Sequence, residues 1–246
     1  MQIDHTPADV IVVDERHRLP IGRPYVTAAI DEATKCVPGF VVTLEAPSAA
    51  SVGLCLAHMA IDKRAWLERI GVEAVWPMSG KPHQLYVDNA AEFKSEALRR
   101  GCEQHGIGVC YRPPGAPHYG GIVERLVGTM MRIVHDLPGT TFSNTRERGE
   151  YDSDAAAVLT LAELQRWMAL AVACYHGEPH AGLGASLGHR RPACTGGDLG
   201  VAALRALAVG YTGETVDGRV GCGDAGSRTA DRRAGNLRRA ADLDTS

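Results

Sequence analysis

The order of apolar runs and helical periodicities predicts an α/β protein with three layers, a sheet between two layers of helices. Three apolar runs come first and suggest a meander, with a turn at 32–35 before the last of them. Two further strands are each connected through a helix, which indicates a mixed sheet. The strands are expected at 10–13, 25–30, 36–44, 83–87 and 107–111, and the helices at 52–70, 93–103, 122–137 and 161–175.

Capping patterns support the helix assignments. Ser48 is a candidate N-cap for the helix at 52–70, and Gly71 follows its end. Asn89 with Glu92, and Thr160 with Glu163, have the spacing of capping boxes before apolar periodic segments. The Pro- and Gly-rich segment 112–121 is incompatible with regular structure, and the polar segment 138–156 is expected to be a mobile loop.

Composition sets the class of protein. The chain has 246 residues, of which 45% are hydrophobic and 22% charged, as in soluble globular domains. No apolar stretch approaches a membrane span and the first residues have no leader-like pattern, so we expect a cytoplasmic protein. The formal charge of −3 lacks the basic character of a domain that holds nucleic acid by charge alone. If DNA is the substrate, metal ions or further domains must help.

The composition changes near residue 198 and suggests a domain boundary. We expect one folded core at 1–190 and an Ala/Gly/Arg-rich tail at 191–246 that is largely disordered. The part of the tail from residue 198 has no Phe, Trp, Ile or Met, which would leave it without a second core.

Several kinds of active site lack their minimal motifs. The chain has no P-loop, no dinucleotide-binding glycine motif after a strand, no nucleophile elbow and no H-E-x-x-H. What remains is a set of carboxylates at the ends of predicted elements: Asp4, Asp88 and Glu124. Three converging carboxylates form an oxygen-rich site suited to Mg²⁺ or Mn²⁺. Thirty-five residues separate Asp88 from Glu124.

With these residues in place, the sequence resembles the catalytic cores of DDE transposases and retroviral integrases, most closely the Mu-type transposases of bacterial elements. The matching strings are QIDHT from residue 2, LYVDNAAEF from residue 85 and PHYGGIVER from residue 117. Their order and the 35-residue spacing are more specific than any one of them. The resemblance covers residues 1 to about 187.

The resemblance implies a ribonuclease H-like fold with a five-stranded mixed sheet flanked by helices. It also implies a DNA phosphoryl transferase in which Asp4, Asp88 and Glu124 hold two Mg²⁺ or Mn²⁺ ions. The implied reactions are DNA strand nicking at transposon ends and strand transfer into target DNA during transposition. The implied partners are these DNAs and further copies of the chain, in a bacterial DNA-associated homo-oligomer without a membrane.

Other residues compete for roles in this site. Asp9, Asp14 and Asp31 are alternatives to Asp4 as the first carboxylate, and strand parity would place Asp4 and Asp14 on one face and Asp9 on the other. Candidate DNA contacts are Asn89, Glu92, Arg112, His118 and Tyr119, although capping explains the first two equally well.

Glycines at 120, 121 and 128 leave one face of the helix around Glu124 bare. Such a face suits close approach of a metal ion and a DNA strand, or else tight packing of the helix on the sheet.

Two other functions remain open. The chain begins at the first catalytic strand and passes into the tail where the family continues into a small β-barrel, as a fragment or frameshifted gene would. It would then be a catalytically silent transposase fragment that acts as a DNA-binding or assembly module. A weaker alternative is a ribonuclease H-like nuclease or resolvase.

Overall fold

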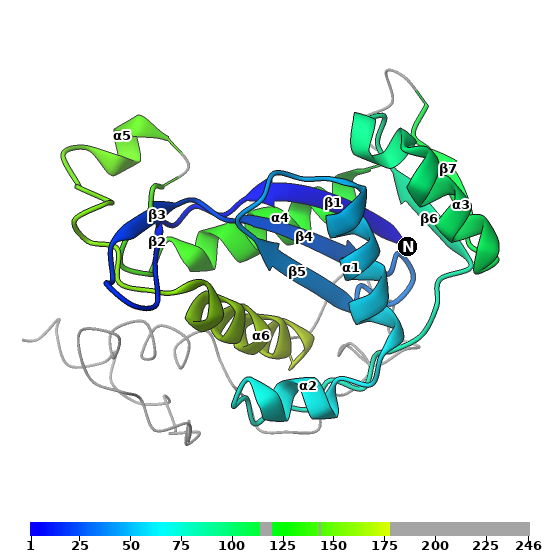
Figure 1. Ribbon diagram of the computed structural model, residues 1–246, viewed down its shortest axis with the longest axis horizontal. Coiled ribbons are helices and arrows are strands. Elements are labelled where there is room, and N and C mark those ends of the chain that lie inside the picture. The colour runs from blue at the N-terminus through cyan, green and yellow to red at the C-terminus, as the bar shows by residue number, and fades with distance from the viewer. Residues whose placement is uncertain (114–119, 143, 178–246) are drawn as a thin grey trace, which may run out of the picture.

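The computed structural model describes residues 1–113, 120–142 and 144–177 (Figure 1). The predicted tail at 191–246 and two candidate DNA contacts, His118 and Tyr119, lie outside the described residues. The strands are β1 (Gln2–Pro7), β2 (Val12–Val13), β3 (Pro20–Gly22), β4 (Tyr25–Ile30), β5 (Gly39–Thr43), β6 (Gln84–Val87) and β7 (Gly108–Tyr111). The helices are α1 (Ala49–Ala60), α2 (Arg64–Arg69), the 3₁₀ turn η1 (Ala91–Lys94), α3 (Glu96–Gln104), α4 (Gly121–Val134), α5 (Thr145–Arg148) and α6 (Leu161–Gly177).

Five of these strands form one mixed sheet in the order β5-β4-β1-β6-β7. Strands β5, β4 and β1 pair antiparallel, whereas β1, β6 and β7 pair parallel. The antiparallel strands follow one another through hairpin-type connections, and each parallel strand is reached through a helix. This is the predicted ribonuclease H-like architecture, a five-stranded mixed sheet flanked by helices, and the fold-class prediction is confirmed.

Two apolar cores lie on the two faces of the sheet. The core on one face joins β4 and β5 to α4 and α6, with Val26, Phe40, Leu126 and Trp167 among its members. The core on the other face joins β1 and β6 to α1 and α3, and includes Ile3. Figure 1 shows α1 in front of the strands and α4 behind them. Alternation along β1 therefore sends successive side chains into different layers.

The predicted first strand is in the wrong place. The sheet strand is β1, which ends at Pro7, and of the run at 10–13 only Val12 and Val13 pair, with β3 in a separate two-stranded ladder. A proline lacks the N–H needed to continue a ladder, which is consistent with the end of β1 at this residue. Because the strand is interrupted, the parity argument cannot be extended from Asp4 to Asp9 or Asp14.

The helix predicted at 52–70 is two helices, α1 and α2, with a break between them. Ser48 caps α1 as predicted, in a reciprocal arrangement with Ser51. At the break, the fully buried Lys63 donates from Nζ to the carbonyls of Met59, Ile61 and Met78, at 3.3, 2.8 and 3.2 Å. These bonds satisfy carbonyls that the end of α1 leaves open, so the break is a built feature of the fold.

The two predicted capping boxes have different outcomes. At the start of α6 the box is confirmed, because Thr160 N donates to Glu163 Oε2 at 2.7 Å and Glu163 N donates to Thr160 Oγ1 at 3.2 Å. The box at Asn89 and Glu92 is wrong, because the 3₁₀ turn η1 there has no side-chain cap. Ser95 caps α3 instead, accepting from Leu98 N at 3.1 Å.

The segment predicted as a polar loop at 138–156 contains the short helix α5. It is tied down by the Tyr151 hydroxyl, which accepts from Gly139 N at 3.0 Å, and by the buried Ser153 hydroxyl, which donates to Thr140 O at 2.7 Å. Among the described residues, every helix is too short or too polar to cross a lipid bilayer.

A buried histidine lies in the aromatic part of the larger core. His58 packs edge-on against Trp66, with ring centroids 4.4 Å apart, and its Nδ1 accepts from Phe40 N at 3.2 Å. Burial, together with the smaller effect of the nearby Lys63 ammonium, lowers the pKa of His58 to about 4. The ring is therefore neutral at physiological pH.

We predict that the free energy of unfolding falls by about 3 kcal/mol between pH 6.5 and pH 4 because of His58. The sign follows from a folded pKa below the unfolded one, because the unfolded chain then binds the extra proton. Urea unfolding at several pH values would measure the slope. The variant His58→Asn keeps an acceptor toward Phe40 N. Its free energy of unfolding should depend less steeply on pH over this interval. Identical slopes in the two proteins would show that His58 is not responsible.

Candidate active site

Three of the predicted site residues lie side by side on adjacent strands: Asp4 within β1, and Asp88 and Arg112 directly after β6 and β7. In the parallel pair of β1 and β6, Gln2 lies opposite Tyr86, so continuing the register by two residues sets Asp4 beside Asp88. In the pair of β6 and β7, Val87 lies opposite Tyr111, which brings Arg112 next to Asp88 on the other side. The carboxyl ends of parallel strands meet at one edge of the sheet, as in other α/β proteins that carry sites there.

Glu124 is brought to this edge by the first turn of α4. The position of that turn is fixed by Gln2, whose side-chain carbonyl Oε1 accepts from Val123 N at 3.1 Å. The first N–H groups of a helix lack partners within the helix, so a buried glutamine on β1 satisfies one of them. Because Gln2 and Asp4 are two residues apart on one strand, both side chains face α4.

The guanidinium of Arg112 lies between Asp4 and Glu124. Its Nη1 is 3.4 Å from Glu124 Oε1, and its Nη2 is 3.9 Å from Asp4 Oδ2. The Arg112 side chain is only 13% exposed, compared with 24% for Asp4 and 55% for Glu124. One cation therefore lies buried between two of the three carboxylates.

The pKa of Asp4 is changed by the neighbouring carboxylates and by Arg112. Burial raises the pKa of Asp4 above its ordinary value, and the negative charges of Asp88 and Glu124 raise it further. The hydrogen bond from His5 N to Asp4 Oδ1, at 2.8 Å, and the Arg112 charge lower it. A carboxylate in this position favours a nearby cation.

The remaining predicted residues have local partners at the same edge. Asp88 Oδ1 accepts from Ala90 N at 2.9 Å, which turns the chain after β6. The Asn89 amide donates to the carbonyl of Arg112 at 2.8 Å, so it ties the end of β6 to the end of β7. Glu92 lies on η1 and is half-buried. Burial lowers the pKa of His5. The negative charges of Glu92 and Asp88 raise it, but by less.

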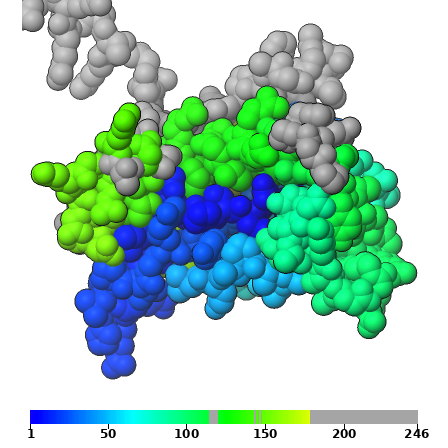
Figure 2. Space-filling view, turned by 90° about the horizontal axis from the view of Figure 1, so that it is seen from above, coloured from blue at the N-terminus to red at the C-terminus, as the bar shows by residue number. Residues whose placement is uncertain are grey.

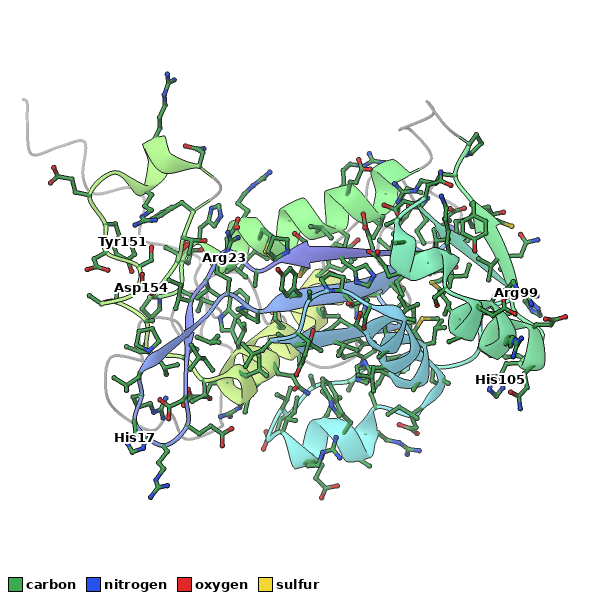
Figure 3. All side chains as sticks on the ribbon, turned by 45° about the horizontal axis from the view of Figure 1, so that its top comes forward. His17, Arg23, Arg99, His105, Tyr151 and Asp154 are labelled. Atoms are coloured by element: carbon green, nitrogen blue, oxygen red, sulfur yellow. The ribbon has the colours of Figure 1, made fainter. Side chains whose placement is uncertain are left out.

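The three alternatives to Asp4 are engaged elsewhere. Asp9 pairs with Arg23 at 2.6 Å and with His135 at 2.9 Å. Asp14 accepts three backbone N–H bonds in the turn between β2 and β3. Asp31 accepts from the backbone and hydroxyl of Thr34. Figure 3 shows Arg23 far from Arg99 and His105 of the α3 region, at the other end of the sheet. Of the four candidates, Asp4 is the one beside Asp88 and Glu124.

The sequence did not predict the roles of two residues at this site, Gln2 and Gly120. Gln2 gave no indication of its role, because the N–H that it caps is 121 residues away in the chain. Gly120 was noted for leaving a bare helix face, but a Cβ there would overlap the guanidinium of Arg112. At Gly121 and Gly128 an added Cβ would meet open space among the described residues. The need for a bare position is thus specific to Gly120.

The donor chemistry of Asp4, Asp88 and Glu124 fits a hard divalent cation, because all six side-chain oxygens are carboxylate oxygens. Figure 2 shows β1, in dark blue, reaching the surface between the green helix α4 and the blue-green segment after β6. As arranged around Arg112, however, no three acidic, histidine or cysteine side chains of the described residues are gathered closely enough to hold a metal ion.

Comparison with known proteins shows the family to which this chain belongs. The family described as TnsB C-terminal domain matches residues 2–139. The transposase for transposon Tn552 of Staphylococcus aureus is 28% identical over 144 residues, 58% of this chain and 28% of that protein. The Tn7 transposition protein TnsB of Escherichia coli is 29% identical over 168 residues, 66% of this chain and 24% of that protein. The chain thus spans about a quarter of the length of these relatives.

Among solved structures, the catalytic core domain of BIV integrase is similar, with 19% sequence identity and a TM-score of 0.34. The match covers 66% of this chain and 80% of that chain.

We predict that Gln2→Leu lowers the free energy of unfolding by about 1–3 kcal/mol, because Val123 N and the carboxylate of Glu32 lose a buried partner. Urea unfolding would measure the change. The matched control is Gln84→Leu on β6, where the side chain is exposed and a change within about 0.5 kcal/mol is expected. Equal effects of the two substitutions would contradict the role given to Gln2.

Proposed function

Because this chain belongs to the family of the TnsB C-terminal domain, we propose that it is a metal-dependent DNA phosphoryl transferase of the DDE transposase class. Its reactions would be DNA strand nicking at transposon ends and strand transfer into target DNA. The observation that carries the proposal is that Asp88, after β6, and Glu124, on α4, lie near enough to Asp4 of β1 for their charges to raise its pKa.

In this proposal Asp4, Asp88 and Glu124 hold two Mg²⁺ or Mn²⁺ ions. Such ions supply an activated oxygen nucleophile and charge stabilisation for in-line displacement at phosphorus. The chain's own contribution is orientation: His5 N fixes one oxygen of Asp4, and Ala90 N fixes one oxygen of Asp88. Glu124 is more exposed and lies on a helix whose first turn is anchored by Gln2.

We assign DNA contacts to Asn89, Glu92, Arg112, His118 and Tyr119, which flank this edge in the sequence. Arg112 has the planar donor group that suits a phosphate oxygen, whereas His118 and Tyr119 would stack on or bond to nucleotides. The proposed partners are transposon-end and target DNA and further copies of the chain in a homo-oligomer. The proposed location is the bacterial cytoplasm, where DNA is accessible.

A second candidate function is a catalytically silent transposase fragment that binds DNA or joins an assembly. The observation in its favour is that Arg112 separates the carboxylates, and that no metal-binding group is gathered among the described residues. This function predicts no thermal stabilisation by Mn²⁺, whereas the first predicts a shift of the melting temperature that depends on Asp88.

We predict that Asp88→Asn and Glu124→Gln each abolish Mn²⁺-supported nicking of supercoiled DNA, with at least a hundredfold loss expected from removing a metal ligand. The melting temperature without metal should change little, because neither carboxylate is fully buried. The assay is agarose-gel conversion of supercoiled to nicked circles.

The controls are Asp62→Asn, in the break between α1 and α2, and Glu103→Gln on α3; both are exposed carboxylates in local ion pairs. They should nick at the wild-type rate. Nicking by Asp88→Asn at the control rate would refute the assignment.

A further inference from the structure

The guanidinium of Arg112 occupies a space bordered by Gly120, Asp4 and Glu124, here called the seat. The seat fits a guanidinium. Gly120, the residue before α4, leaves the space that the group occupies, and a Cβ at this position would overlap it. The backbone of Gly120 has φ −100° and ψ −7°, which any residue adopts, so the turn itself does not require glycine. The absence of a side chain at 120 thus serves the arginine.

The guanidinium is held in this seat by charge more than by hydrogen bonds. Its Nε and Nη2 are buried and have no hydrogen-bond partner among the described residues. Its one hydrogen bond, from Nη1 to Glu124 Oε1, is long at 3.4 Å, and the approach to Asp4 is 3.9 Å. A buried arginine in a structural ion pair normally makes short bidentate bonds. The weak bonding here means that little is lost when the group leaves.

The backbone of Arg112, in contrast, is firmly fixed. Its N–H donates to Val87 O at 2.9 Å, and its carbonyl accepts from the Asn89 amide at 2.8 Å. The side chain can therefore swing out of the seat by rotation about its own torsions, without movement of β7. An arginine side chain has enough rotatable bonds to carry the guanidinium to solvent.

We propose that Arg112 is a resident counter-cation that competes with the divalent ions for Asp4 and Glu124, and that ion binding requires it to leave the seat. The inference rests on the proposed function. A guanidinium between two carboxylates partly satisfies their charge and repels a second cation a few ångströms away. Departure of the group would let the carboxylates close around the ions and would free Arg112 for a DNA phosphate.

The test measures binding of Mn²⁺ to the full chain without DNA. Binding is detected by electron paramagnetic resonance, as the loss of the signal of the free ion. Arg112→Gln removes the competing charge. Gly120→Ala displaces the guanidinium and keeps the charge in the protein. Both should bind Mn²⁺ roughly tenfold more tightly than the wild type. Melting curves without metal check that both variants fold.

The matched control is Arg125→Gln. Arg125 is also next to Glu124, but it is exposed and its Nε donates to Gly121 O at 2.9 Å. Loss of this charge should tighten Mn²⁺ binding less than twofold, roughly as expected for a screened surface charge. Equal tightening by Arg125→Gln and Arg112→Gln would show a general charge effect and overturn the proposal.

Two further outcomes separate this inference from the proposed function. If the wild type binds Mn²⁺ through Asp88, as shown by loss in Asp88→Asn, but neither Arg112→Gln nor Gly120→Ala tightens binding, only the inference fails. Tightening in Arg112→Gln alone also overturns it, because the seat would then play no part. If the wild type binds no Mn²⁺, or Asp88→Asn binds equally well, the proposed function fails and this inference with it.

Discussion

The pairing of β1 with β4 on one side and β6 on the other is the constraint on which the site and both cores depend. Within six residues, β1 sends Gln2 and Asp4 toward α4 and sends Ile3 and His5 toward the opposite face. A slip of one residue in either ladder would exchange these faces, turning Asp4 into an apolar core and Ile3 toward the carboxylates beside α4. The two ladders therefore fix the position of Asp4 more firmly than any contact of its own side chain.

The same strand also fixes the distance between sheet and helix at the site. Gln2 binds the first turn of α4 and, through its amide, Glu32 at 2.7 Å. Glu124 is one residue beyond the capped N–H of Val123, so its approach to Asp4 is set by this buried glutamine. Asn89 performs a similar task between β6 and β7, by holding the carbonyl of Arg112. Polar side chains that join neighbouring elements thus surround the three carboxylates.

Local patterns predicted those elements whose structure is decided locally. The strand β4 and the capping box of α6 were predicted from apolar runs and from side chains three residues apart. Long-range contacts decided the rest. Lys63 binds the carbonyl of Met78 and stabilises a break that helical periodicity conceals. Asn89 binds the carbonyl of Arg112 instead of capping a helix, because a partner 23 residues away is in reach.

The candidate site divides in the same way. Residue chemistry and the spacing of Asp88 and Glu124 predicted that the three carboxylates form one site, and the structure brings Asp88 and Glu124 near enough to Asp4 to raise its pKa. Residue chemistry and spacing do not predict the position of the Arg112 side chain. That position follows from the register of β6 and β7 and from the absence of a side chain at Gly120. A sequence with three converging carboxylates must also balance their repulsion when the protein folds. The guanidinium of Arg112 offsets part of that repulsion here, because it lies between Asp4 and Glu124.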